Sequence, residues 1–197
     1  DFSTVSVPWD LAGQGLELLI IDTRAPHSLV GGEYAERRAQ AEAGARALGV
    51  ESLRDVPFEG ASDACRGISD PVVHKRSRHI IGEIERVREF AEILEAGSIR
   101  EGLERIAELL NASHDSLRDD YEVTVPELDV AVDAAREAGA HGARMTGGGF
   151  GGSVIALVDA EMVEDVASAV QSAFAKRALA EPVFFLATPS RGAGRDR

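Results

Sequence analysis

Residues 144–158 read RMTGGGFGGSVIALV, and this stretch decides more about the fold than any other part of the sequence. Glycine fills all but one of the positions from 147 to 152, although it costs conformational entropy on folding. A chain accepts that cost where its backbone turns sharply or comes very close to another group. The run that follows, residues 153–158, is short and apolar, which predicts a buried strand. We therefore expect a tight glycine loop that follows a helix and opens a strand.

Two interpretations of this loop are open. Successive amides in such a loop can point inward together and cradle a phosphate, or the glycines form only a tight turn into the strand. The G-x-G-x-x-G spacing of dinucleotide-binding loops is present, but those loops follow a strand and open a helix. No Lys-Ser or Lys-Thr follows, so this is not a Walker A loop. The candidate phosphate-contacting residues are Gly147, Gly148, Gly149, Gly151 and Gly152.

The rest of the chain contains two more predicted strands and several predicted helices. Residues 16–21 and 183–187 are short apolar runs of the kind that forms strands. Helices are predicted from composition, from apolar stripes and from two capping boxes, Ser98 with Glu101 and Thr124 with Glu127. The predicted helices are residues 33–48, 80–94, 98–110, 124–139 and 162–174. Residues 50–71 are predicted to be mostly loop. The balance of elements indicates an α+β fold in which a helix-rich layer packs on a small sheet.

The composition limits the classes of partner. The chain carries a formal net charge of −13, which repels nucleic acid and anionic membranes. An anionic ligand such as ATP would therefore need a local nest of donors or a metal ion. A single cysteine, Cys65, cannot form an internal disulfide, which fits a reducing compartment. No run approaches the roughly 18 apolar residues of a membrane span.

A polar cluster at residues 113–121, SHDSLRDDY, is the second candidate site. With His114 and nearby acids such as Asp119 on a helix end, a metal site is conceivable. A solvated helix end with local ion pairs is the simpler interpretation, and we favour it. We assign no metal ligands and no individual roles within this cluster.

Four other residues, His27, Ser28, His79 and Tyr34, are weaker candidates for a functional role. His27 with Ser28 lacks the nucleophile elbow expected of a hydrolase triad. His79, on the long helix, is expected to be packed and hydrogen-bonded. Tyr34 lies where a loop enters a helix, so its phenol is a candidate for ligand contact, although packing is the more frequent role of such a residue.

Several segments resemble the galactokinases, a family of GHMP sugar kinases. Residues 7–38, VPWDLAGQGLELLIIDTRAPHSLVGGEYAERR, are similar to the stretch that begins the second half of bacterial galactokinases. GARMTGGGFGGSVIALV (142–158) resembles the third signature of GHMP kinases. Further similar segments are SLRDV (52–56), DPVVHKRSRHIIGEIERV (70–87) and NASHDSLRDDYEVTVPELD (111–129).

The resemblance implies a GHMP-kinase C-terminal type of domain and a specific reaction. Galactokinases transfer the γ-phosphate of ATP to the C1 hydroxyl of α-D-galactose, with Mg²⁺, in a cleft between two lobes. Tyr34 matches the tyrosine that contacts the sugar, and residues 147–152 match the loop beside the transferring phosphate. A cytoplasmic location is also implied.

The departures from the family pattern concern the first half of the enzyme. The motifs Gly-Glu-His-Thr-Asp, Gly-Leu-Ser-Ser-Ser and Met-Asp-Gln do not occur in the 197 residues. We therefore expect residues 1–197 to be a C-terminal lobe that lacks the N-terminal catalytic lobe, contains no catalytic residue, is inactive alone and tends to self-associate. The alternatives are a non-catalytic galactose-binding homologue, an N-acetylgalactosamine kinase and a stand-alone structural module.

Overall fold

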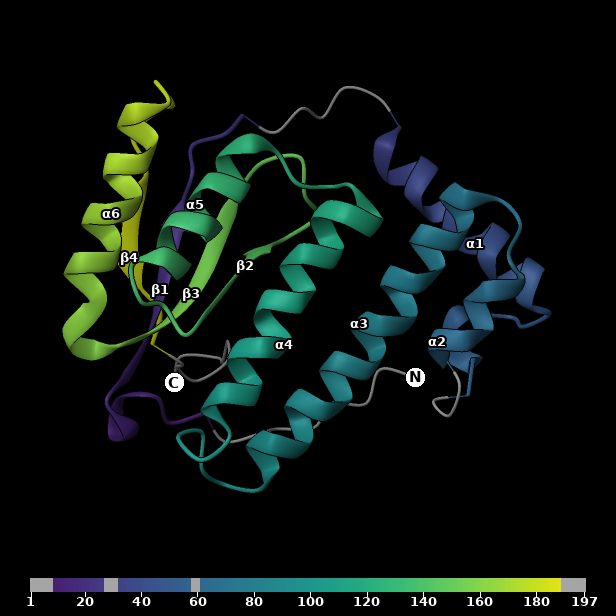
Figure 1. Cartoon of the computed structure of the whole chain (residues 1–197), viewed down its shortest axis with the longest axis horizontal. Coiled ribbons are helices and arrows are strands. Elements are labelled where there is room, and N and C mark those ends of the chain that lie inside the picture. Colours follow the sequence, from purple (N-terminus) through teal and green to yellow (C-terminus); the bar gives the residue numbers. More distant parts are fainter. Residues whose placement is uncertain (1–8, 27–31, 58–60, 189–197) are drawn as a thin grey trace, which may run out of the picture.

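The computed structural model describes residues 9–26, 32–57 and 61–188. Four strands in these ranges form one antiparallel sheet in the order β2-β3-β1-β4 (Figure 1). They are β1 (Leu16–Asp22), β2 (Gly142–Thr146), β3 (Ser153–Asp159) and β4 (Val183–Leu186). Helices pack on this sheet and extend beyond its β2 edge. The fold is therefore the predicted α+β arrangement of a helix-rich layer on a small sheet.

The sheet confirms three predicted strands and adds one. The ends of β1, β3 and β4 agree with the prediction to within one residue. The sequence does not predict β2, because GARMT is short and shows no clear apolar alternation. Thr146 pairs with Ser153 and Met145 with Val154. The expected setting of the glycine loop was therefore wrong: the loop joins two paired strands and does not follow a helix.

All five predicted helices are present, four of them with shifted starts. The helices are α1 (Glu33–Leu48), α2 (Ala61–Ala64), α3 (Pro71–Glu95), α4 (Leu103–Ser116), α5 (Pro126–Glu137) and α6 (Val163–Lys176). Helix α1 ends as predicted at Gly49, whose φ is 71°. Helix α3 begins earlier than its apolar stripe, because the Asp70 carboxylate accepts hydrogen bonds from the amides of Val72 and Val73. Among the described helices, none is both long and apolar enough to cross a membrane.

Two predicted capping boxes were wrong in detail. The Ser98 hydroxyl accepts a hydrogen bond from the Glu101 amide at 3.3 Å, but α4 begins only at Leu103. The Thr124 side chain does not cap α5; its hydroxyl donates to Asp129 at 3.3 Å. This contact makes Thr124 part of the support of the glycine loop, described below.

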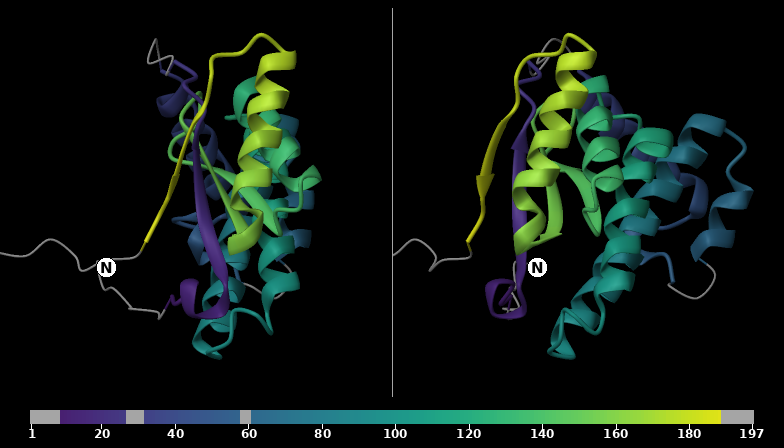
Figure 2. Two further views of the ribbon diagram at one scale, coloured as in Figure 1. Left: turned by 90° about the vertical axis from the view of Figure 1, so that its left-hand side faces the viewer. Right: turned by 60° about the vertical axis from the view of Figure 1, so that its left-hand side comes forward.

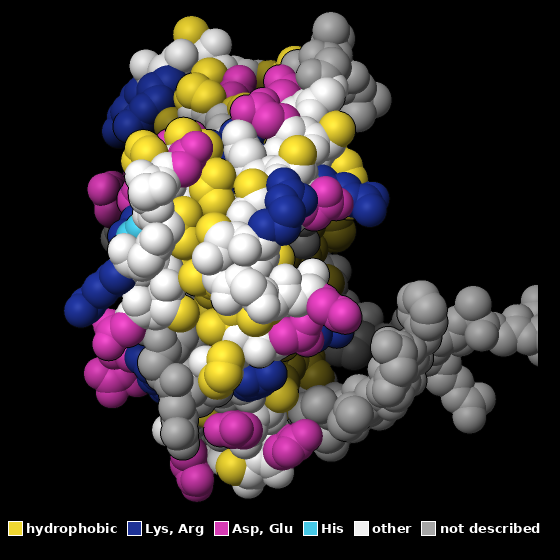
Figure 3. Space-filling model, turned by 90° about the vertical axis from the view of Figure 1, so that its right-hand side faces the viewer, with side chains coloured by type: hydrophobic (Ala, Val, Ile, Leu, Met, Phe, Trp, Pro, Cys, Tyr) yellow, Lys and Arg dark blue, Asp and Glu magenta, His cyan; other side chains and the backbone are white. Residues whose placement is uncertain are grey.

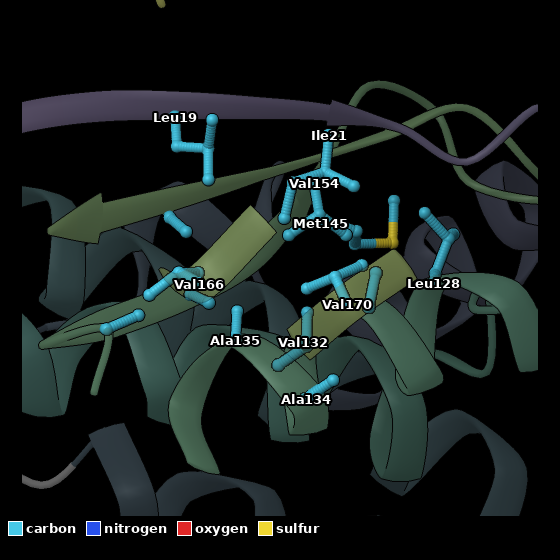
Figure 4. Packing of buried hydrophobic residues seen from close by; sticks show 14 of the residues in the cluster. Leu19, Ile21, Leu128, Val132, Ala134, Ala135, Met145, Val154, Val166 and Val170 are labelled. Atoms are coloured by element: carbon cyan, nitrogen blue, oxygen red, sulfur yellow. The ribbon is translucent and has the colours of Figure 1, made fainter. Parts of the chain in front are cut away.

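The main hydrophobic core lies between the sheet and helices α5 and α6 (Figure 4). Strand residues point into it at every second position, as in Leu19 and Ile21 of β1 and Val154 of β3. Phe174 of α6 is the largest fully buried side chain in this cluster. Burial of this face explains why the register of the sheet is well defined, since a slip of one residue would expose it.

Helices α4, α3 and α1 form a second layer beyond β2. Helix α4 packs along β2, α3 packs on α4, and α1 packs on α3 (Figures 1 and 2). A small cluster that includes Ala45, Leu53 and Ile81 holds α1 and α3 together. On the side formed by α1 and α2, acidic and basic side chains lie close together (Figure 3), as in the pair Arg38–Glu42 at 3.1 Å.

The opposite face of the sheet carries an apolar groove of about 540 Å³. Its walls include Leu18 and Ile155 of the sheet and Val87 and Phe90 of α3. The Phe90 ring stacks on Trp9 with 5.6 Å between the ring centroids. Val87 is 64% exposed, so the predicted apolar stripe of α3 faces this groove in part instead of the core.

Candidate phosphate-binding loop and its support

The glycine loop, residues 147–152, is the connection of the β2–β3 hairpin. Positive φ angles occur at Gly147, Gly149, Gly151 and Gly152 and range from 87° to 134°. Phe150 has the same left-handed sense, with φ 60°, which costs about 1–2 kcal/mol for a residue with a side chain. The surrounding contacts must hold this conformation in place.

Two anchors outside the hairpin fix the second half of the loop. The Phe150 amide donates to the Val123 carbonyl at 2.7 Å. The Gly152 carbonyl accepts from both the amide and the hydroxyl of the buried Thr23, at 3.2 and 2.6 Å. A Cβ at Gly149 would lie 2.5 Å from the Val123 carbonyl oxygen. Packing within the chain therefore requires glycine at 149 and fixes the backbone up to 152.

The tip of the loop, Gly147 and Gly148, is in a different situation. Both residues are exposed, and no described atom lies within 4 Å of a Cβ added at either position. Gly147 needs its positive φ of 91°, whereas Gly148 has no positive φ. Neither backbone strain nor packing in the described structure accounts for glycine at 148. The tip is a rigidly supported backbone surface with room for another molecule.

Tyr34 lies in the first turn of α1 and is 79% exposed. One turn later, Arg37 links this helix to the glycine loop. Its guanidinium donates to the carbonyls of Tyr121 and Glu122 at 2.7 and 2.9 Å and lies 5.9 Å from the centre of the Phe150 ring. The structure thus connects the two predicted site elements through one arginine, which the sequence analysis missed.

The segment SHDSLRDDY is not the solvated helix end that we favoured. Residues Leu117–Tyr121 form a π-helical turn after α4, and His114 and Asp120 are buried. The expected surface ion pairs are present at Arg118, which pairs with Asp119 at 2.9 Å and with Asp115 at 3.7 Å. In the described part of the chain, no group of three His, Cys, Asp or Glu side chains has the arrangement of a metal site.

Basic residues of α3 hold this π-helical turn. The Arg76 side chain, 4% exposed, donates to the Asp120 carbonyl, to Gln40 at 3.0 Å and to the Glu122 carboxylate at 2.7 Å. The Arg78 guanidinium pairs with the Asp120 carboxylate. These bonds satisfy backbone and carboxylate groups that the irregular turn leaves without helical partners. Because Val123 follows directly, the same bonds position the anchor of the glycine loop.

The Glu122 carboxylate is predicted to make stability depend on pH. Arg76 and, secondarily, Lys75 hold its pKa at about 2, whereas an unfolded glutamate titrates near about 4.3. The unfolded chain therefore takes up this proton first as the pH falls, and the stabilisation present above about pH 4.5 is lost between roughly pH 4.5 and 2. We expect the urea midpoint of the parent to fall more steeply across this window than that of Glu122→Gln. Parallel curves would show that the pair does not stabilise the fold.

Of the remaining candidates, His79 and Cys65 lie in the described part of the chain and show no catalytic arrangement. His79 is packed and hydrogen-bonded as predicted: its ring stacks on Tyr121 at 4.4 Å, its Nδ1 lies 3.0 Å from the Ser116 hydroxyl, and burial lowers its pKa to about 4. Burial raises the pKa of the Cys65 thiol, which is the opposite of activation. His27 and Ser28 lie outside the described residues.

Known sugar kinases resemble this chain in sequence and in fold. Residues 85–176 match the family described as GHMP kinases C terminal. The chain is 47% identical to the galactokinase of Streptomyces coelicolor over 196 residues, 99% of this chain and 50% of the relative. The chain is therefore similar to galactokinases, which are GHMP kinases, over nearly its whole length. The galactokinase of Mycobacterium tuberculosis is 41% identical over the whole of this chain and 53% of its own length.

A solved galactokinase also has this fold. The crystal structure of Lactococcus lactis galactokinase complexed with galactose superposes with a TM-score of 0.79 at 34% identity, covering 87% of this chain and 45% of that one. The chain thus spans about half the length of the galactokinases it matches. The match to the C-terminal GHMP family agrees with the predicted C-terminal lobe.

Proposed function

We propose that this chain is the part of a galactokinase that borders the transferring phosphate and the sugar, in an enzyme that moves the γ-phosphate of ATP to the C1 hydroxyl of α-D-galactose. The observation that carries the proposal is the exposed loop tip, where neither backbone strain nor packing in the described structure requires residue 148 to be glycine. Such a position suits the close approach of a phosphate to backbone amides. The relatives support the substrate, since they are galactokinases and one is complexed with galactose. They do not favour a sugar sensor, an N-acetylgalactosamine kinase or a stand-alone module.

The residues of this chain would bind and orient, not react. The amides at the loop tip would donate to phosphate oxygens and offset the unfavourable field of a chain with net charge −13. The exposed Tyr34 phenol would hydrogen-bond a sugar hydroxyl. We assign no catalytic residue to this chain and no ligand to Mg²⁺, which binds nucleotide phosphates in this class of reaction. We place the enzyme in the cytoplasm.

The apolar groove would be the packing surface for the other half of the enzyme. The relatives extend about as far again beyond the matched half, and the groove walls are apolar with a polar end at Glu83, Arg86 and Arg144. Uncovered apolar patches of this kind favour association. We expect the isolated chain to self-associate and Val87→Glu, at an exposed groove position, to reduce this association in sedimentation velocity. A monomer at all concentrations would contradict this packing role.

The role of Tyr34 is testable in a joined protein, in which the first half of the Streptomyces coelicolor galactokinase precedes this chain. We expect galactose-dependent release of ADP from Mg-ATP. Tyr34→Phe should raise the KM for galactose about tenfold, the cost of one hydrogen bond, and leave the KM for ATP unchanged. Because the side chain is exposed, the melting temperature should not change. An unchanged galactose KM in a folded, active protein would remove Tyr34 from the sugar site.

A further inference from the structure

Strand β2, which leads into the glycine loop, is an edge strand, and an edge strand has outward backbone groups without a strand partner. Here, two side chains of α4 bind the outward amides. The Ala143 amide donates to Asn111 Oδ1 at 3.0 Å, and the Met145 amide donates to His114 Nδ1 at 3.2 Å. Asn111 and His114 are one turn apart on the helix, which matches two successive outward amides of the strand.

The outward edge of β2 has further hydrogen-bond donors near the start of the strand. Asn111 Nδ2 donates to the His141 carbonyl at 3.4 Å. The Arg136 guanidinium of α5 donates to the carbonyls of Ala143 and Asn111, both at 3.0 Å. Side chains from two helices therefore occupy the hydrogen-bonding positions of a neighbouring strand.

His114 also connects this edge to the opposite anchor of the loop. Since its Nδ1 accepts a hydrogen bond from the Met145 amide, the ring proton lies on Nε2. Nε2 is 3.2 Å from the Asp129 carboxylate, without the alignment of a good hydrogen bond. Asp129 in turn accepts from the Thr124 hydroxyl, next to Val123, whose carbonyl binds Phe150. The fully buried imidazole thus lies between the two supports of the loop.

We propose that Asn111 and His114 are positioning residues. Their side chains take the place of a neighbouring strand at the edge of β2 and set the direction in which β2 enters the glycine loop. Neither residue touches the loop tip, so neither is catalytic. The consequence for phosphate transfer rests on the proposed function, but the positioning itself is measurable without any ligand.

The first test needs no variant. In the ¹⁵N-labelled chain, we expect the His114 ring to show an unprotonated Nδ1 and a scalar coupling across the hydrogen bond between this nitrogen and the Met145 amide. A protonated Nδ1, or no coupling in a folded sample, would overturn the proposal.

The second test uses matched variants. His114→Leu removes the acceptor, whereas Asn at this position offers an Oδ1 close to the place of Nδ1. We expect amide exchange at Met145 to be about tenfold faster in His114→Leu, with shifted amide resonances at 147–149, and both effects to be largely reversed in His114→Asn. Unchanged loop resonances in folded His114→Leu, or no reversal by Asn, would contradict positioning. If the joined protein lacked turnover while these effects held, only the proposed function would fail.

Discussion

Replacing Gly149 by alanine is expected to lower the free energy of unfolding by about 3 kcal/mol, which is among the largest effects in the molecule. Two causes add. The added Cβ would lie 2.5 Å from the Val123 carbonyl oxygen and 2.6 Å from the Val123 Cβ, so backbone must move. The φ of 87° is also unfavourable for any L-residue with a side chain. Urea denaturation monitored by circular dichroism measures the loss.

The neighbouring Gly148 is the matched control. It lies in the same loop but has no positive φ and no described atom within 4 Å of an added Cβ. Gly148→Ala should therefore change the free energy of unfolding by less than about 0.5 kcal/mol. Equal effects of the two substitutions would contradict the division of the loop into an anchored half and an open tip.

The second large effect is expected from Arg76→Leu, at about 3 kcal/mol. The substitution keeps apolar volume but removes the donors to Gln40, to Glu122 and to the buried Asp120 carbonyl. Losing the last contact leaves a buried acceptor unsatisfied, which costs more than the loss of an exposed pair. The π-helical turn and Val123 should loosen together, which faster amide exchange at residues 117–123 would reveal.

Lys75 provides the comparison, because it pairs with the same Glu122 carboxylate at 3.0 Å from a 45% exposed position. Lys75→Leu should cost no more than about 1 kcal/mol, as is usual for exposed ion pairs. If Arg76→Leu and Lys75→Leu lowered the free energy of unfolding equally, the bonds of Arg76 to the π-helical turn would not be its main contribution to stability.

Much of the fold follows from local patterns in the sequence. The apolar runs of β1 and β3 and the glycine that ends α1 are signals within a few residues, and the structure confirms them. Strand β2 has no such signal, because it is stabilised by β3 and by side chains of α4. Sequence periodicity cannot reveal a strand whose stability comes from a helix 30 residues earlier.

In the candidate site, too, residues with a local sequence signal could be predicted, and residues that depend on distant contacts could not. The glycines are visible as composition, and Tyr34 is visible as a helix-start phenol with a family resemblance. The misjudged segment SHDSLRDDY looks polar and therefore solvated, but its partners on α3 lie 30 or more residues away, as in Glu83 with Ser113 and Arg78 with Asp120. Arg37 and Thr23, which reach the loop across even longer separations, have no local signal at all.

A loop tip that is open for a phosphate should be needed for catalysis, and turnover in the joined protein tests this most directly. Gly148→Val fills the tip, whereas Gly67→Val alters another glycine with no positive φ and no described neighbour within 4 Å of an added Cβ. We predict that Gly148→Val lowers kcat roughly 100-fold without changing the melting temperature, and that Gly67→Val has parental kcat. Parental turnover by a folded Gly148→Val protein would contradict the claim.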